Sequence, residues 1–229
     1  MVVDVWSDVV CPWCYIGKRN LEAAIEQLGE EVEVRWHSFE LDPRSPKTLD
    51  RPLTEVLASK YGMPVSRAEQ LQAQVTAKAA SVGLEFRFDR AKTGNTFDAH
   101  RLIHLAASQD LGGAMKERLL RAYFTDGEAI SDPEALARLA DEVGVTGAAA
   151  MLASDAHAEA VRADEREAVE LGASGVPFFV VDKKFGVPGA QPPDVLLKVL
   201  RHAQAEAAAS IQINPGEACE DGACEVPQG

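Results

Sequence analysis

Residues 7–18 read SDVVCPWCYIGK and carry two cysteines, Cys11 and Cys14, three positions apart. The apolar run before them, residues 2–6, predicts a short buried strand. Pro12 stands where the first residue of a helix is expected, and apolar side chains then recur at helical spacing as far as Gly29. The segment therefore predicts a strand that leads into a helix, with the cysteine pair at the junction.

Further strand signals occur at both ends of the chain. Apolar Val32, Val34 and Trp36 alternate with polar residues and predict a second strand, which completes a βαβ unit. Residues 176–181 and 185–187 predict two more strands, and an amphipathic last helix reaches about residue 208. These parts indicate a domain of the α/β class.

The middle of the chain is helical and too long for an ordinary crossover between strands. Helices are predicted over residues 53–61, 67–82, 96–109, 115–124, 133–143 and 159–171. We therefore expect a discontinuous α/β domain (1–45 and 173–208), an inserted helical subdomain (46–172) and a flexible C-terminal tail (209–229).

The position of the first cysteine pair predicts its chemistry. A cysteine exchanges disulfides as its thiolate, so a catalytic cysteine needs a lowered pKa. The free N–H groups and the dipole of a first helical turn favour an anion. Cys11 is therefore expected to be the attacking nucleophile, and Cys14, one turn later and more buried, to be the resolving thiol. Trp13 between them brings no positive charge, so the thiolate is expected to be only moderately stabilised.

Composition excludes several classes of function. The formal net charge is −13, whereas a nucleic-acid partner requires a basic surface. No stretch approaches the roughly 18 consecutive apolar residues of a membrane span. The pattern of a signal peptide is not seen either, so a cytoplasmic location is expected. The four cysteines form two close pairs, which in a reducing compartment favours redox chemistry or metal binding over a structural disulfide framework.

The second pair, Cys219 and Cys224, lies in a tail rich in proline, glycine and acidic residues. Asp221-Gly222 supplies a turn that can bring the two sulfurs together. Because acidic neighbours disfavour thiolates, this pair is predicted to be the more reducing one and to pass electrons to an oxidised Cys11–Cys14 pair. Two alternatives stay open: incidental thiols, or a zinc site shared by all four cysteines.

The segment around Cys11 and Cys14 resembles the DsbA-like oxidoreductases, specifically the FrnE type. The resemblance covers most of the chain and includes FELDP at 39–43, NTFDAHRL at 95–102 and GVPFF at 175–179. It implies a thioredoxin-like fold with a large inserted α-helical subdomain over the active site. It also implies a cis peptide bond before Pro177 and backbone groups of Val176 that are offered to a substrate.

The residues expected to contact substrate are Pro12, Trp13, Val176, Pro177 and His100. Trp13 can equally be a packing residue. His100 is expected first of all to be a packing or surface histidine, and only the resemblance brings it to the cleft.

Two other polar patterns are expected to have no ligand. His100 and His104 have the i, i+4 spacing of metal ligands but lack an acidic companion, so no metal site is predicted. The acidic residues of the last inserted helix are expected on a solvated face: Glu159, Asp164, Glu165, Glu167 and Glu170.

These features predict a thiol–disulfide oxidoreductase that reduces or isomerises disulfides of misoxidised proteins, without a bound cofactor. Glutathione or a thioredoxin-type protein is the expected reductant. The alternatives are a zinc-binding module and a glutathione-dependent transferase or isomerase of the kappa-class or chromene-carboxylate isomerase type. Proteins of that second type have serine at the position of Cys11, so the presence of both cysteines favours redox exchange.

Overall fold

The structure of the protein, a computed structural model, describes residues 1–48 and 51–210. The elements follow one another along the chain as β1 (Val2–Ser7), α1 (Pro12–Leu28), β2 (Glu33–Ser38), α2 (Leu53–Tyr61), α3 (Val65–Ala80), α4 (Phe97–Ala107), α5 (Gly112–Arg121), a π-helical turn η1 (Ala122–Asp126), α6 (Pro133–Val143), α7 (Ala148–Leu152), α8 (Ala158–Glu170), β3 (Phe178–Val181), β4 (Phe185–Pro188) and α9 (Pro193–Ser210). The strands thus come from the two ends of the chain, and helices α2–α8 lie between them in the sequence.

The strands form one sheet in the order β2-β1-β3-β4. β1 and β2 run parallel, because α1 carries the chain back between them, whereas β3 is antiparallel to both β1 and β4. Val5 in β1 lies opposite Trp36 of β2 and Phe179 of β3. This order and these directions are those of a thioredoxin fold, with α2–α8 inserted between β2 and β3.

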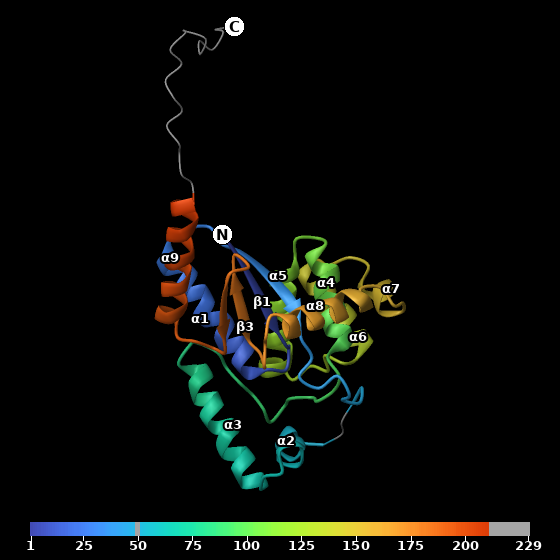
Figure 1. The fold of residues 1–229 in the computed structure, drawn as a ribbon. Coiled ribbons are helices and arrows are strands. Elements are labelled where there is room, and N and C mark those ends of the chain that lie inside the picture. The colour runs from blue at the N-terminus through green and yellow to red at the C-terminus, as the bar shows by residue number, and fades with distance from the viewer. Residues whose placement is uncertain (49–50, 211–229) are drawn as a thin grey trace, which may run out of the picture.

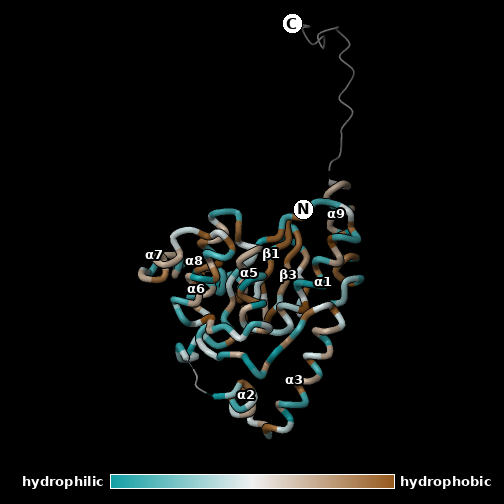
Figure 2. Tube along the Cα trace, turned by 180° about the vertical axis from the view of Figure 1, so that it is seen from behind, coloured by the Kyte–Doolittle hydropathy of each residue, from teal (hydrophilic) through white to brown (hydrophobic). Residues whose placement is uncertain are grey.

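Alternate residues of β1 face different layers, because successive side chains of a strand point to opposite faces. Val3 and Val5 are buried in a core with α1 and α9. Trp6 packs on the other face, against Ala168 of α8. Figure 1 shows this arrangement, with α1 and α9 on one side of the sheet and α4, α5 and α8 on the other. In Figure 2 the tube is brown along β1 and β3, in the interior, and mostly teal or white in the outer loops.

The largest core belongs to the inserted helices. It joins Leu102 of α4, Leu119 of α5 and Leu136 of α6, and it also takes in Val9 and Ile16. The first half of α1 therefore packs against the inserted helices, while its second half packs against α9. α2 and α3 extend away from this core, and α3 contacts α1 (Figure 1).

The differences from the predicted elements have local causes. α2 and α6 have the predicted bounds, whereas α5 begins at Gly112 and was predicted from residue 115. The later predicted start arose because Gly112-Gly113 is a typical helix-breaking signal. The turn η1 replaces the predicted end of that helix. α7 was not predicted, since a run of five small or apolar residues shows no period.

α9 ends at Ser210, close to its predicted end. The rest of the predicted flexible tail, with Cys219 and Cys224, lies outside the described residues. Within the described ranges, none of the helices has the length and apolar character needed to span a membrane.

Candidate active site

The first cysteine pair lies where β1 passes into α1. β1 ends at Ser7, and in the following turn the amide of Cys11 donates a hydrogen bond to the carbonyl of Asp8 at 3.3 Å. Cys11 precedes the helix with an extended backbone (φ −86°, ψ 113°), and Pro12 fills the first helical position. The first turn of α1 contains no acidic side chain, so no carboxylate of the helix itself opposes the positive end of the helix dipole.

Both thiols are free and almost completely buried, with 3% of Cys11 and 1% of Cys14 exposed. Burial raises the pKa of the Cys14 thiol well above its ordinary value, and the adjacent Cys11 sulfur adds to this rise. Lys116 and the Asp8 backbone N–H oppose the rise without cancelling it. Cys14 is therefore protonated at neutral pH, as a resting thiol.

A loop from the other end of the chain closes over Cys11. The Val176–Pro177 peptide bond is cis, as the resemblance implied. The Cys11 thiol donates a hydrogen bond from Sγ to the Val176 carbonyl oxygen at 3.5 Å, across 165 residues of chain. Two of the predicted site residues, Cys11 and Val176, are thus in direct contact.

Gly17 allows this loop to approach α1. A Cβ atom at this position would lie 2.9 Å from Cγ of Pro177 and 3.2 Å from Cζ of Phe179, so only glycine fits without displacement. The sequence analysis missed this residue. An isolated glycine inside a helical pattern was the signal, because such a glycine often has a packing reason.

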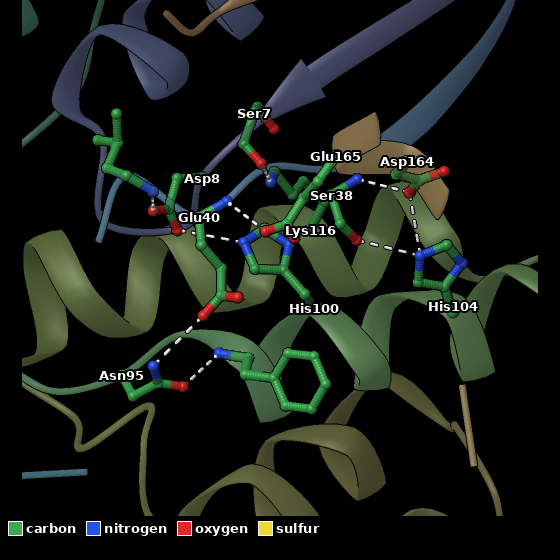
Figure 3. A network of polar contacts seen from close by, with 12 residues as sticks. Ser7, Asp8, Ser38, Glu40, Asn95, His100, His104, Lys116, Asp164 and Glu165 are labelled. Carbon is green, nitrogen blue, oxygen red and sulfur yellow. Dashed lines mark hydrogen bonds and ion pairs between the residues drawn. The ribbon is translucent and has the colours of Figure 1, made fainter. Parts of the chain in front are cut away.

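A buried carboxylate lies behind the cysteines. Asp8 is fully buried; its Oδ2 accepts a hydrogen bond from the Leu41 amide at 2.7 Å, and its Oδ1 lies 3.2 Å from Nε2 of His100 (Figure 3). Burial favours a higher pKa for Asp8, but His100, the Leu41 amide and the charge of Lys116 outweigh it, so the pKa is lowered. Asp8 is therefore ionised, and Nε2 of His100 must carry the proton of their hydrogen bond.

The structure buries His100, in agreement with the packing role that was expected first for it. Its side chain is fully buried, so it cannot contact a substrate at the surface. Instead it binds Asp8 from α4, and its Nδ1 is buried without a hydrogen-bond partner among the described residues. His100 thus belongs to the layer beneath the site.

Lys116 of α5 lies in the same layer. Its side chain is fully buried, and Nζ donates a hydrogen bond to the Ser7 carbonyl at 3.1 Å and lies 5.7 Å from the Trp36 ring centroid. Burial lowers the pKa of Lys116 to about 8, although the charges of Cys14, Asp8 and Cys11 favour the ammonium form. The sequence analysis missed this residue too. Its signal was its place on an apolar helical face, since Leu119, Leu120 and Tyr123 follow it at i+3, i+4 and i+7.

Two large apolar side chains near the pair are exposed. Trp13, between the cysteines, is 43% exposed, and Leu41, whose amide binds Asp8, is 42% exposed. Exposed aromatic and aliphatic side chains beside a reactive group are typical of a surface that contacts a protein partner.

A second polar cluster lies against β2. Asp164 was expected on a solvated face of α8, but it is buried, and its carboxylate contacts His104 at 3.0 Å and the Ser38 amide at 2.7 Å (Figure 3). It also contacts His37 at 3.0 Å. The other ring nitrogen of His37 contacts Asp4 at 2.9 Å. These contacts attach α8 to β2 and α4.

Among the residues that the structure describes, the group that could hold a metal ion belongs to this cluster. His37, Asp164 and Glu167 offer ligand atoms within 4.8 Å of one another. However, Asp164 and Asp4 already engage both nitrogens of His37, and together they raise its pKa despite partial burial, which favours the imidazolium form. The cluster is therefore explained as an ion-pair network.

Comparison with known proteins places the chain in a family. Residues 2–201 match the model described as the DSBA-like thioredoxin domain. The crystal structure of the probable DsbA oxidoreductase SCO1869 from Streptomyces coelicolor is 41% identical, covers 100% of both chains and superposes with a TM-score of 0.85. The uncharacterised protein YwbO of Bacillus subtilis is 30% identical over 206 residues, 88% of this chain and 96% of its own.

A more distant structure shares the fold. The cytosolic disulfide reductase DsbM from Pseudomonas aeruginosa, solved with GSH, is 22% identical and superposes with a TM-score of 0.64 over 90% of this chain and 100% of its own. Since the family match spans nearly all the described residues and the cysteine pair opens α1 of a thioredoxin fold, this chain belongs to the DsbA-like thiol–disulfide oxidoreductases.

Proposed function

We propose that the protein reduces or isomerises disulfide bonds of proteins, with Cys11 as the attacking thiolate and Cys14 as the resolving thiol. The observation that carries the proposal is the 3.5 Å contact between Cys11 Sγ and the Val176 carbonyl, because it puts the nucleophile beside an irregular backbone edge. A substrate peptide that pairs with this edge through its own backbone would bring its disulfide to Cys11.

The reaction proceeds by two thiol–disulfide exchanges. The Cys11 thiolate attacks one sulfur of the substrate disulfide and forms a mixed disulfide, while the other substrate sulfur leaves as a thiolate. Cys14 then loses its proton and attacks Cys11 Sγ, which forms the Cys11–Cys14 disulfide and releases the second substrate thiolate. Two electrons pass from the cysteine pair to the substrate, and an external thiol must return them.

The raised pKa of Cys14 supports this division of labour. A protonated thiol does not attack, so the mixed disulfide lasts until a proton is removed from Cys14. A long-lived mixed disulfide allows a substrate thiol to attack instead, which is isomerisation. The neutral Trp13 between the cysteines supports the reducing direction, since no charge there stabilises the Cys11 thiolate.

The partners we propose are proteins with non-native disulfides and, as electron donor, glutathione or a thioredoxin-type reductant. The DsbM structure with GSH supports a glutathione donor, and the name of that protein supports a cytoplasmic location. We also propose that the protein is of the FrnE type and that Cys219 and Cys224, which lie outside the described residues, form a second redox pair.

Insulin reduction by a chemical dithiol tests the proposal. Cys11→Ser should abolish acceleration, whereas Cys14→Ser should accumulate protein–insulin mixed disulfides that mass spectrometry detects. Full activity of Cys11→Ser together with loss in Cys14→Ser would reverse the assignment. The reduction potential of the pair, measured against glutathione buffers, decides between reduction and oxidation in the cell.

The glutathione-dependent transferase or isomerase alternative predicts a different result. Such an enzyme would convert a small aromatic substrate with glutathione and would tolerate Cys11→Ser, because proteins of that type have serine at this position. Turnover of such a substrate in the absence of insulin reduction would select this alternative.

A further inference from the structure

A buried asparagine lies in the middle of α1. Asn20 follows Cys11 by nine positions and is only 3% exposed. Asparagine is a weaker helix former than alanine, leucine or lysine, and a buried amide without a hydrogen-bond partner destabilises a fold. The side chain of Asn20 therefore needs a specific partner inside the protein.

That partner belongs to the segment between β4 and α9. Nδ2 of Asn20 donates a hydrogen bond to the Gln191 carbonyl at 2.9 Å, across 171 residues of chain. In the part of the chain that the structure describes, the other side-chain hydrogen bonds of α1 go to Glu117 of α5 or stay within the helix. Asn20 thus supplies the side-chain hydrogen bond that ties α1 to residues 189–192.

Residues 189–192 are in turn bonded to the loop that contacts the nucleophile. The Gln191 amide donates to the Gly189 carbonyl at 2.9 Å, and the Gly189 amide donates to the Pro177 carbonyl at 2.8 Å. Gly189 has a φ of +75°, a left-handed conformation that glycine adopts readily. The next carbonyl along the loop, that of Val176, accepts the hydrogen bond from Cys11 at 3.5 Å. Printed contacts therefore connect Asn20 to Cys11 without a gap.

The same face of α1 also packs against this loop. A Cβ atom on Gly17, one turn before Asn20, would lie 2.9 Å from Cγ of Pro177 and 3.5 Å from Cβ of Ala190. Such packing contacts limit how closely the loop approaches the helix, but they are not directional. A hydrogen bond is directional, so the one from Asn20 also fixes where the loop lies along the helix.

We propose that Asn20 is a positioning residue that holds the Val176 carbonyl beside Cys11 and thereby favours protein disulfides over small disulfides as substrates. This inference rests on the proposed function, in which a substrate backbone pairs with the edge at Val176 while its disulfide reaches Cys11. A protein substrate must meet both requirements at once, whereas a small disulfide needs only to reach the sulfur. A displaced loop should therefore slow the reaction with proteins selectively.

The variant Asn20→Leu tests this selectivity. Leucine has a similar size and a higher helix propensity, so α1 is retained while the hydrogen bond to Gln191 is lost. All proteins carry the full chain with Cys219→Ser and Cys224→Ser, so that only the first pair reacts. We expect kcat/KM for insulin to fall about tenfold, while the release of coloured thiolate from a chromogenic aromatic disulfide by Cys11 stays within about twofold.

Tyr15→Phe is the matched control. It removes another side-chain hydrogen bond of α1, from the Tyr15 hydroxyl to Oε1 of Glu117 at 2.6 Å, which leads to α5 and not to the loop. The ratio of the two rates should stay within about twofold of the wild-type ratio. An unchanged ratio in Asn20→Leu, or the same change in Tyr15→Phe, would overturn the inference. A wild-type protein that reacts with the small disulfide but does not reduce insulin would instead refute the proposed function, and this inference with it.

Hydrogen exchange in the reduced wild-type protein decides the question even if Asn20→Leu does not fold. The amides of Gly189 and Gln191 donate the hydrogen bonds that link Asn20 to the loop. If residues 189–192 are held against α1, both amides should exchange at least about a hundredfold more slowly than unprotected peptide amides. Exchange at the unprotected rate in the folded protein would show that this segment is not fixed and would overturn the inference.

Discussion

Substituting Gly17 with alanine adds one methyl group at the closest contact between α1 and the loop at Pro177. The new Cβ would lie 2.9 Å from Pro177 Cγ, whereas carbon atoms prefer about 3.5–4.0 Å, and Phe179 blocks escape on the other side at 3.2 Å. Overpacking of this kind costs about 1–3 kcal/mol, while the helix propensity of alanine returns about 1 kcal/mol. We expect a net loss of about 1 kcal/mol in the free energy of unfolding, or a Tm lower by about 2–4 °C.

The rate of insulin reduction should fall more than the stability does, because the added methyl group would displace the loop that holds the Val176 carbonyl against Cys11. We expect a roughly tenfold slower insulin reduction, since small misplacements at a reacting centre are costly. Gly113→Ala in α5 is the control: a Cβ there meets only Trp36 Nε1 at 3.7 Å, so this variant should gain about 0.4–1 kcal/mol and keep its activity. A Gly17→Ala protein that is as stable and as active as Gly113→Ala would refute this reasoning.

Three further predictions concern other parts of the site. Asp8→Asn should lower the free energy of unfolding at pH 7 by about 3 kcal/mol. Because the folded-state pKa of Asp8 is lowered, its stabilising contribution exists above the unfolded-state pKa and disappears as the pH falls through the folded-state value. Urea unfolding should therefore show that the stability difference between variant and wild type shrinks below about pH 4. Trp13→Ala should raise the KM for insulin about five- to tenfold without slowing reaction with a small aromatic disulfide, because only a protein substrate covers the exposed ring. Mass spectrometry of Cys14→Ser should detect a Cys11 disulfide with Cys219 or Cys224, and its absence would count against a second redox pair.

The elements that could be predicted from the sequence are those whose signals lie within a short stretch of chain. Pro12 after Cys11 predicts the start of α1, and the alternation of Val32, Val34 and Trp36 predicts β2, because each signal depends on neighbours in the chain. The cis bond before Pro177 was expected only from the resemblance to the DsbA-like oxidoreductases, because no local pattern indicates it. These features place the cysteine pair and the loop that closes over it.

The layer behind the cysteines could not be predicted in the same way. Charged residues are expected at the surface, and only tertiary packing reveals that Asp8 is buried and that Asp164 leaves the solvated face of its helix. The apolar helical face that carries Lys116 indicates an inward position, but not which groups its side chain meets. His100 could be placed on α4, but its orientation toward Asp8 depends on how α4 packs against the turn after β1. Such contacts join residues far apart in the chain, and sequence periodicity carries no information about them.

The contact between Cys11 and Val176 has a consequence for the biosynthesis of the protein. The two residues are 165 positions apart, so at about 5–20 residues per second a ribosome adds Val176 roughly 8–33 s after Cys11. Once the reactive pair has left the ribosome, it lacks the loop at Val176 for the rest of this interval. The nascent chain therefore carries two accessible thiols, and only synthesis in a reducing environment would deliver them to the folded protein unmodified.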